Sequence, residues 1–310
     1  MLLNLQHHNL RDMEKIKRID TVRDYNDYMG VDTLHPLVSV VNFSEVPAVI
    51  YFKMYMGVYA VFLKNVKCGD MIYGCQPYDY EDGTLVFVSP GQVYGIDSKG
   101  IPVKPSGYAL VFHPDLIRGT NLGRHIKSYT FFSYEVNEAL HLSKKERKTI
   151  VDCLEKIAAE TELNVDKHSK TLMVSNIELL LNYCMRFYDR QFITRSNVNK
   201  DILARFENLL NEYFKSDKAL VSGLPSVTYC ANELHLSPNY FGDLIKKETG
   251  NTALDYIQNK LIDEAKTKIF DPAKSINDIA TGLGFKYQQH FTRLFKQKVG
   301  ITPNEYRNLN

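Results

Sequence analysis

The arrangement of apolar and polar positions changes twice along the chain. Between about residues 30 and 115, short runs rich in Val, Ile, Tyr and Phe alternate with turn signals, and the runs lie at 37–43, 48–56, 59–63, 84–88 and 108–112. Many short strands at such spacing are typical of a sandwich or barrel. Between 143 and 188, apolar residues recur every three or four positions, which predicts two amphipathic helices.

From Asp201 onward the pattern is helical to the end, apart from short breaks at Gly, Pro and Asn. This segment contains an internal repeat. Residues 244–256 and 294–306 share Leu, Lys, Gly, Thr and Tyr at an offset of 50, and Ala231 matches Ala280 at an offset of 49. A supersecondary unit is therefore used twice, and two copies predict a paired module because they are too few for a solenoid.

Each copy has the pattern of a helix-turn-helix. In the first, a short apolar helix is followed by a tight turn at His235-Leu236, and Ser237 caps a second helix that begins with Pro238. In the second copy Gly284 takes the turn. Two such patterns in register, joined by a predicted helix at 254–269, favour a DNA-binding module over a chance match.

The last hundred residues resemble the DNA-binding domain of the AraC/XylS family of bacterial transcription regulators. The matching residues include Leu236-Ser237, Gly250, Tyr256-Ile257, Leu261, Ala265, Ile279-Ala280, Gly284-Phe285, Phe291, Arg293, Phe295-Lys296, Gly300, Thr302-Pro303 and Tyr306-Arg307. The resemblance implies two subdomains, joined by a long helix, whose recognition helices enter successive major grooves. The chain departs from the family pattern at Lys260, where Arg is usual, and at Gln289 and His290, where Ser and Tyr are usual.

Charge adds to this prediction. No acid lies between Asp278 and Glu305, a stretch that carries Lys286, Arg293, Lys296 and Lys298 and so should attract DNA phosphates. Gln side chains can contact adenine, and Arg can contact guanine. With the positions that the resemblance implies for base reading, the predicted DNA-binding residues are Ser237, Asn239, Gly242, Asp243, Lys246, Lys286, Gln288, Gln289, Thr292, Arg293 and Lys296. The alternative is a charged face that only contacts solvent.

The N-terminal half resembles, over residues 83–91 and 107–114, the cupin-like effector domain that many members of the same family carry. The predicted fold class is therefore α+β, with a cupin-like β-barrel and trailing helices before an all-α double helix-turn-helix domain. The predicted boundaries are 1–142 for the effector-binding domain, 143–188 for a helical dimerisation segment that includes Leu180 and Leu181, 189–199 for a polar linker, and 200–310 for an autonomous DNA-binding domain.

The sequence does not favour an enzyme. Catalytic cupins bind a metal through an HxH pair, an acid and a further His, but here His113 stands alone before a proline and His7-His8 lies near the N-terminus. We therefore predict no catalytic residue, no metal and no cofactor. Four tyrosines are candidates for an effector pocket, although aromatic residues in strands are equally typical of plain core; they are Tyr51, Tyr55, Tyr59 and Tyr73.

Composition limits the protein class. With 310 residues, 44% of them hydrophobic, the chain is not a disordered protein, and its net charge of +2 excludes a strongly basic chromatin-like protein. Five scattered cysteines without a CxxC pair favour reduced thiols, and no apolar run is long enough for a membrane span, so the expected location is the cytoplasm.

The leading hypothesis is a transcription regulator that responds to a small organic effector. Its expected partners are double-stranded DNA, that effector and a second copy of the chain, with RNA polymerase as a further candidate and no membrane. Two alternatives remain open: a cupin-type enzyme fused to a DNA-binding tail, and a regulator whose N-terminal half dimerises without a ligand.

Overall fold

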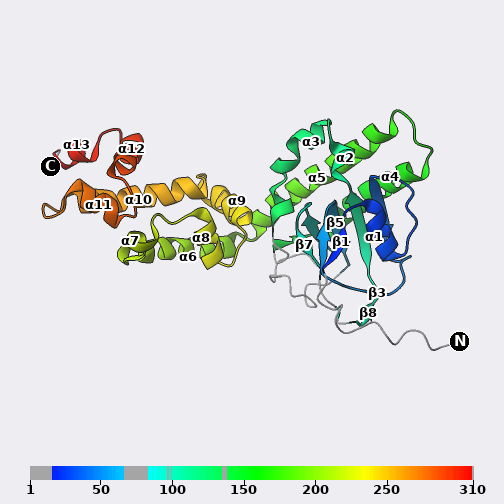
Figure 1. Cartoon of the computed structure of the whole chain (residues 1–310). Helices are drawn as coiled ribbons and strands as arrows, with labels where there is room; N and C mark the ends of the chain where they lie inside the picture. The colour runs from blue at the N-terminus through cyan, green and yellow to red at the C-terminus, as the bar shows by residue number, and fades with distance from the viewer. Residues whose placement is uncertain (1–15, 66–82, 96–97, 99, 135–137, 309–310) are drawn as a thin grey trace. The chain divides into compact units, whose positions relative to one another are not determined.

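A computed structural model describes residues 16–65, 83–95, 98, 100–134 and 138–308. Its internal contacts divide the chain into two units, Met1–Thr194 and Arg195–Asn310. In the described residues all strands belong to the first unit, and the second unit is built of helices and connecting turns (Figure 1). The predicted mixed α+β class is confirmed at this level.

The first unit contains three sheets. Its strands are β1 (Lys17–Ile19), β2 (Val38–Asn42), β3 (Val49–Ile50), β4 (Met54–Met56), β5 (Tyr59–Lys64), β6 (Thr84–Val88), β7 (Val93–Tyr94), β8 (Pro102–Val103), β9 (Gly107–Phe112) and β10 (Leu140–His141). Five form an antiparallel sheet in the order β10-β6-β5-β9-β2, three form the sheet β1-β4-β7, and β3 pairs with β8. The described strands do not close into a barrel, so the predicted cupin-like barrel is not confirmed.

The five-stranded sheet buries apolar side chains on both of its faces. Ala60 and Phe62 of β5 face a core that they share with Met54 and Met56 of β4 and with α1 (Val22–Met29). On the other face Phe87 packs against a group of aromatic rings, those of Phe131, Phe132 and Tyr188. Apolar side chains are therefore buried on both faces of the sheet, and each face is covered by other elements.

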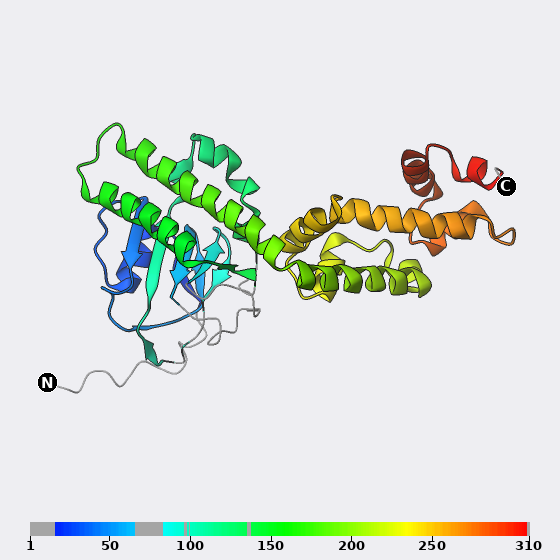
Figure 2. The same cartoon turned by 180° about the vertical axis from the view of Figure 1, so that it is seen from behind.

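Helices cover one face of the five-stranded sheet (Figure 2). The first unit also contains α2 (Pro114–Ile117), α3 (Asn121–His125), two short 3-10 turns (Ile126–Ser128 and Thr130–Ser133), α4 (Lys144–Glu162) and α5 (Ser169–Thr194). The helices α4 and α5 pack side by side over the sheet (Figure 2). Ser143 begins α4 with a capping box to Glu146. No helix in the described part of the chain is long and apolar enough to cross a membrane.

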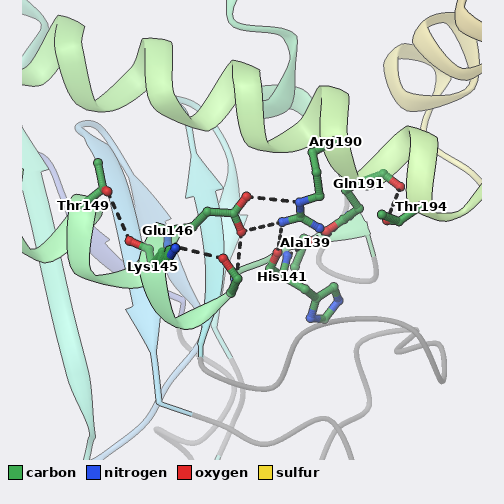
Figure 3. Close-up of polar contacts among 9 residues, drawn as sticks. Ala139, His141, Lys145, Glu146, Thr149, Arg190, Gln191 and Thr194 are labelled. Atoms are coloured by element: carbon green, nitrogen blue, oxygen red, sulfur yellow. Dashed lines mark hydrogen bonds and ion pairs between the residues drawn. The ribbon is translucent and has the colours of Figure 1, made fainter.

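Side chains from the end of α5 bind the backbone of residues 138–141, which lead into and form the edge strand β10 (Figure 3). The Gln191 amide donates to the Ala139 oxygen (3.1 Å) and accepts from the His141 nitrogen (2.8 Å). Arg190 donates to the His141 oxygen (2.6 Å) and, through two nitrogens, to the Glu146 carboxylate at 3.1 and 2.8 Å. We call these contacts of Arg190 and Gln191 the α5–β10 clamp. They satisfy backbone groups that an edge strand otherwise leaves open.

The second unit consists of eight helices in its described residues: α6 (Ser196–Lys215), α7 (Lys218–Ser222), α8 (Val227–Glu233), α9 (Pro238–Thr249), α10 (Ala253–Ile269), α11 (Ile276–Gly282), α12 (Gln288–Val299) and α13 (Pro303–Arg307). The stretch 189–199, expected as a linker, is helical on either side of Arg195. Its polar side chains include Gln191 and Asn199, which are buried and hydrogen-bonded. Gln191 and Asn199 are thus interior groups with hydrogen-bond partners, which a sequence pattern cannot distinguish from polar residues of a solvated linker.

Candidate nucleic-acid interface

The two helix-turn-helix copies have the same backbone hydrogen bonds at their turns. In the first, the amide of Leu236 donates to the Ala231 oxygen over 3.0 Å, and in the second the amide of Phe285 donates to the Ala280 oxygen over the same distance. These pairs are offset by 49 residues, as in the sequence. The repeat predicted from the sequence is therefore confirmed in the backbone.

The turn residue differs between the copies. His235 has a φ of 58° and is the one non-glycine residue with positive φ in the described chain, while Gly284 has a φ of 94° at the equivalent position. A β-carbon on Gly284 would lie 2.6 Å from the backbone carbon of Gly223 and 2.9 Å from the oxygen of Ala219. The second turn is thus closed against the end of α7, and only glycine fits there.

The second helix of each copy, α9 or α12, presents the predicted contact residues. The two are called the reading helices below. The helix α9 is anchored by buried Phe241, Leu244 and Ile245, and α12 by buried Phe291 and Phe295. Each helix ends at a left-handed glycine, Gly250 or Gly300. These anchors hold the opposite face of each helix toward solvent.

Most of the predicted DNA-binding residues are accessible on these faces. Six are exposed, namely Asn239, Lys246, Lys286, Gln289, Arg293 and Lys296, and four are half-buried, namely Gly242, Asp243, Gln288 and Thr292. Ser237 is buried instead, and its hydroxyl accepts the Tyr240 amide as the cap of α9. The structure therefore gives Ser237 a local structural contact, while the others are exposed or half-buried.

One lysine of the acid-free stretch, Lys298, forms an ion pair within the second unit. Lys298 was counted with the cations of the acid-free stretch, but its ammonium lies 3.0 Å from a carboxylate oxygen of Asp255, which is 43 residues away in sequence. This lysine is thus neutralised within the unit. The exposed cations on and next to α12 that remain from the set are Lys286, Arg293 and Lys296.

Sequence reasoning missed one exposed aromatic residue, Tyr287, at the start of α12. Tyr287 is half exposed, and its ring meets the His290 ring edge-on at a centroid distance of 5.6 Å. The Lys286 ammonium lies over the Tyr287 ring at 5.6 Å. Tyr287 occupies the N-cap of α12 without a side-chain capping bond. An aromatic residue where Ser, Thr, Asp or Asn is preferred was the signal available in the sequence.

The three described tyrosines of the proposed effector pocket, Tyr51, Tyr55 and Tyr59, lie apart from one another. Tyr51 packs half-buried against the core shared by β4, β5 and α1, whereas Tyr59 lies on the opposite face of the sheet with its ring stacked on Phe112 at 5.0 Å. Tyr55 lies between two inward-facing methionines of β4, and the Arg18 guanidinium sits 4.6 Å over its ring. Tyr73 lies outside the described residues.

The candidate metal and thiol residues are accounted for where they are described. No group of three His, Cys, Asp or Glu side chains suited to a metal ion occurs among the described residues, and His113 caps α2. Burial raises the pKa of the Cys153 and Cys184 thiols, and it raises the pKa of Cys230 to about 12. His7, His8, Cys68 and Cys75 lie outside the described residues.

Comparisons with known proteins agree with this geometry. A helix-turn-helix domain family matches residues 230–309. The Transposon Tn10 TetD protein of Escherichia coli is 32% identical over 143 residues, covering 46% of this chain and 91% of TetD. The HTH-type transcriptional regulator YtdP of Bacillus subtilis is 38% identical over 77 residues, covering 25% of this chain but only 10% of YtdP.

Among solved structures, the C-terminal domain of the response regulator yesN from Fusobacterium nucleatum is 24% identical, with a TM-score of 0.31, and the match covers 34% of this chain and 98% of that domain. ToxT from Vibrio cholerae is 12% identical, with a TM-score of 0.28, and the match covers 87% of this chain and 96% of ToxT.

Proposed function

Because this chain belongs to the AraC/XylS family of transcription regulators, we propose that it binds double-stranded DNA sequence-specifically through α9 and α12 and thereby regulates transcription. The observation that carries the proposal is the doubled turn, with the same hydrogen bonds in both copies and a reading helix after each. Helix α12 and the residues just before it add the exposed cations Lys286, Arg293 and Lys296, which suit a phosphate backbone.

The two reading helices should contribute differently. In α9 the base-facing positions include Asp243, a carboxylate that phosphates repel but that can accept a hydrogen bond from cytosine. In α12 Arg293 suits a bidentate contact with guanine. We therefore assign most of the electrostatic affinity to α12 and discrimination at a few positions to α9.

Substitution at Arg293 and Asp243 tests this assignment. We expect Arg293→Ala to cost about 1–3 kcal/mol of binding free energy on a duplex selected from a randomised library. Asp243→Asn should change affinity less, or raise it, while relaxing preference at one base pair. Binding of the full chain is measured by fluorescence anisotropy over a salt series, and base preference by repeating the selection with each variant.

The control is Lys274→Ala, which removes an exposed cation outside both reading helices and should leave affinity unchanged. Equal losses from Arg293→Ala and Asp243→Asn, with the same base preference as wild type, would contradict the assignment. A wild-type chain that binds DNA without salt dependence would contradict the proposed function itself.

We also propose a homodimer, formed through α5. Leu180 and Leu181, expected in the dimer stripe, are fully buried within the first unit, so they stabilise its own fold. A different stripe is accessible at alternating spacings of three and four residues: Leu172, Ser175, Leu179, Asn182, Arg186, Asp189 and Ile193. This is the spacing of a seam between two helices, and its apolar members are Leu172, Leu179 and Ile193, while the other four are polar or charged.

A charge in that stripe should separate the subunits. We expect Leu179→Glu to convert a dimer into a monomer at micromolar concentration, because it replaces the central one of the three apolar side chains of the stripe by an ionised carboxylate. Light scattering coupled to size-exclusion chromatography measures the mass. Leu220→Glu on α7, a substitution at another exposed leucine, should leave the dimer intact. A monomeric wild-type chain would disprove the dimer.

A small organic effector in the first unit also stays part of the proposal, on the strength of the family resemblance. The separated positions of Tyr51, Tyr55 and Tyr59 do not support the predicted pocket, so no ligand-contacting residue is assigned. A thermal-shift screen against sugars and aromatic metabolites distinguishes a ligand-responsive regulator from one whose first unit only dimerises. RNA polymerase remains a proposed partner of the DNA-bound form.

A further inference from the structure

The last turn of the reading helix α12 is tied to the first turn of α10. The Lys298 ammonium donates to one carboxylate oxygen of Asp255 over 3.0 Å. The other oxygen accepts the Thr252 hydroxyl over 2.7 Å, so the carboxylate is held from two sides. Lys298 is 20% exposed and Asp255 47%, and the bonds from Thr252 and Lys298 lower the pKa of Asp255.

The repeat shows what is particular about this ion pair. The residue that corresponds to Lys298 in the first copy, at an offset of 50, is Glu248 near the end of α9. Glu248 also bonds to a preceding long helix, accepting from the Asn199 amide of α6 over 3.0 Å. The same position near the end of each reading helix is thus used to attach that helix, but with different chemistry and a different partner helix.

In the second copy, the ion pair between Lys298 and Asp255 joins α12 to the start of α10, the helix that follows the first copy. Asp255 lies only five residues after Gly250, the C-cap of α9, so its position follows the end of that helix closely. In the second copy Glu305, which corresponds to Asp255, accepts from the backbone and hydroxyl of Thr302 at the start of α13, and Lys296 of the same copy acts on it only through its charge. Lys298 therefore relates the end of α12 to the end of α9.

We infer that Asp255 and Lys298 are positioning residues that set the separation of α9 and α12, and with it the number of base pairs between the two sequences that the protein reads. The inference rests on the proposed function. Two helices that enter successive major grooves must be spaced by about one helical turn, roughly 34 Å or 10 base pairs. An ion pair between the copies restricts departures from that spacing, whereas a lysine that only attracts phosphate does not.

Lys298→Met tests this role because it removes the charge and keeps the aliphatic stem. The probes are a duplex selected with the wild-type full chain and two derivatives with one base pair inserted or deleted between the two half-sites. We expect wild type to lose at least about tenfold in affinity on the altered duplexes, since a misplaced helix loses several contacts at once. In Lys298→Met this penalty should fall to about threefold, with weaker binding at the original spacing.

The matched control is Lys296→Met, an exposed lysine on the same helix whose charge acts on Glu305 within the second copy but which makes no ion pair between the copies among the described residues. It should lower the slope of log affinity against log salt by about one, as expected for a lost phosphate contact, and leave the spacing penalty unchanged. Lys298→Met should leave the salt slope unchanged. Asp255→Asn, which keeps the shape of the side chain that accepts the Thr252 hydroxyl, should relax spacing as Lys298→Met does, and the double variant should relax it no further.

The inference is overturned if Lys298→Met keeps the wild-type spacing penalty, or if it lowers the salt slope as Lys296→Met does. Circular dichroism of each variant verifies that the helices are retained, and Asp255→Asn gives an independent reading should Lys298→Met be unfolded. A wild-type chain that selects no duplex contradicts the proposed function instead, so the two failures are distinguishable.

Discussion

Replacing Gly284 by alanine should lower the free energy of unfolding of the second unit by about 2–5 kcal/mol. The new β-carbon would lie 2.6 Å from the carbon and 2.7 Å from the oxygen of the Gly223 backbone, and neither atom can rotate away. The φ of 94° is also unfavourable for any residue with a β-carbon. Chemical denaturation followed by circular dichroism measures the loss, and DNA affinity should fall because the turn supports α12.

The first copy supplies the control at the equivalent position. His235→Gly places glycine at a φ of 58° where a histidine already lies, so relief of the left-handed conformation offsets the added freedom of the unfolded chain. We expect its unfolding free energy to stay within about 1 kcal/mol of wild type. If Gly284→Ala were equally mild, the packing of α7 against the second turn would not be rigid.

Replacing Arg190 by alanine should destabilise the first unit by about 2–3 kcal/mol. The substitution removes two hydrogen bonds to Glu146, which is only 15% exposed, and one to the backbone of β10 (Figure 3). The cost comes mainly from leaving a largely buried carboxylate without its partner, and it is below that of a fully buried pair because water reaches both side chains in part. Denaturant titration of the full chain measures it.

An exposed pair of the same kind provides the comparison. Arg118 and Asp115 approach to 2.9 Å, close to the 2.8 Å between Arg190 and Glu146, but Arg118 is 79% exposed. Arg118→Ala should therefore cost less than about 1 kcal/mol. Similar losses from both substitutions would show that burial does not give the α5–β10 clamp its strength.

Local signals made the second unit predictable. Ser237 and Thr252 cap their helices, and Gly250 and Gly300 end theirs in the left-handed conformation. Each of these depends on residues a few positions apart. The Lys298–Asp255 ion pair joins residues 43 positions apart, and a charge pattern read along the chain placed Lys298 with the DNA-facing cations. A charge pattern compares residues that are close in sequence, so it does not detect a partner 43 positions away.

The first unit was predicted less completely for the same reason. The runs at 59–63 and 84–88 are strands, as β5 and β6 show, but their apolar side chains do not reveal that helices cover one face of their sheet. Strand β1 precedes the region predicted as β, and it pairs in parallel with β4. The sequence placed Gln191 in a linker because it shows only that the residue is polar. It does not show that its amide forms hydrogen bonds with the backbone of an edge strand and not with water.

The buried thiols give each unit its own built-in measure of local opening. Cys184 lies in the first unit and Cys230 in the second, both with no exposed surface and with the pKa raised by burial. A thiol reagent reacts with the thiolate, so labelling of either residue must wait for the structure around it to open. In a chain with Cys68, Cys75 and Cys153 replaced by serine, the labelling rate of Cys230 therefore reports how far DNA suppresses opening of the reading unit. The rate at Cys184 reports, in the same tube, whether the first unit responds.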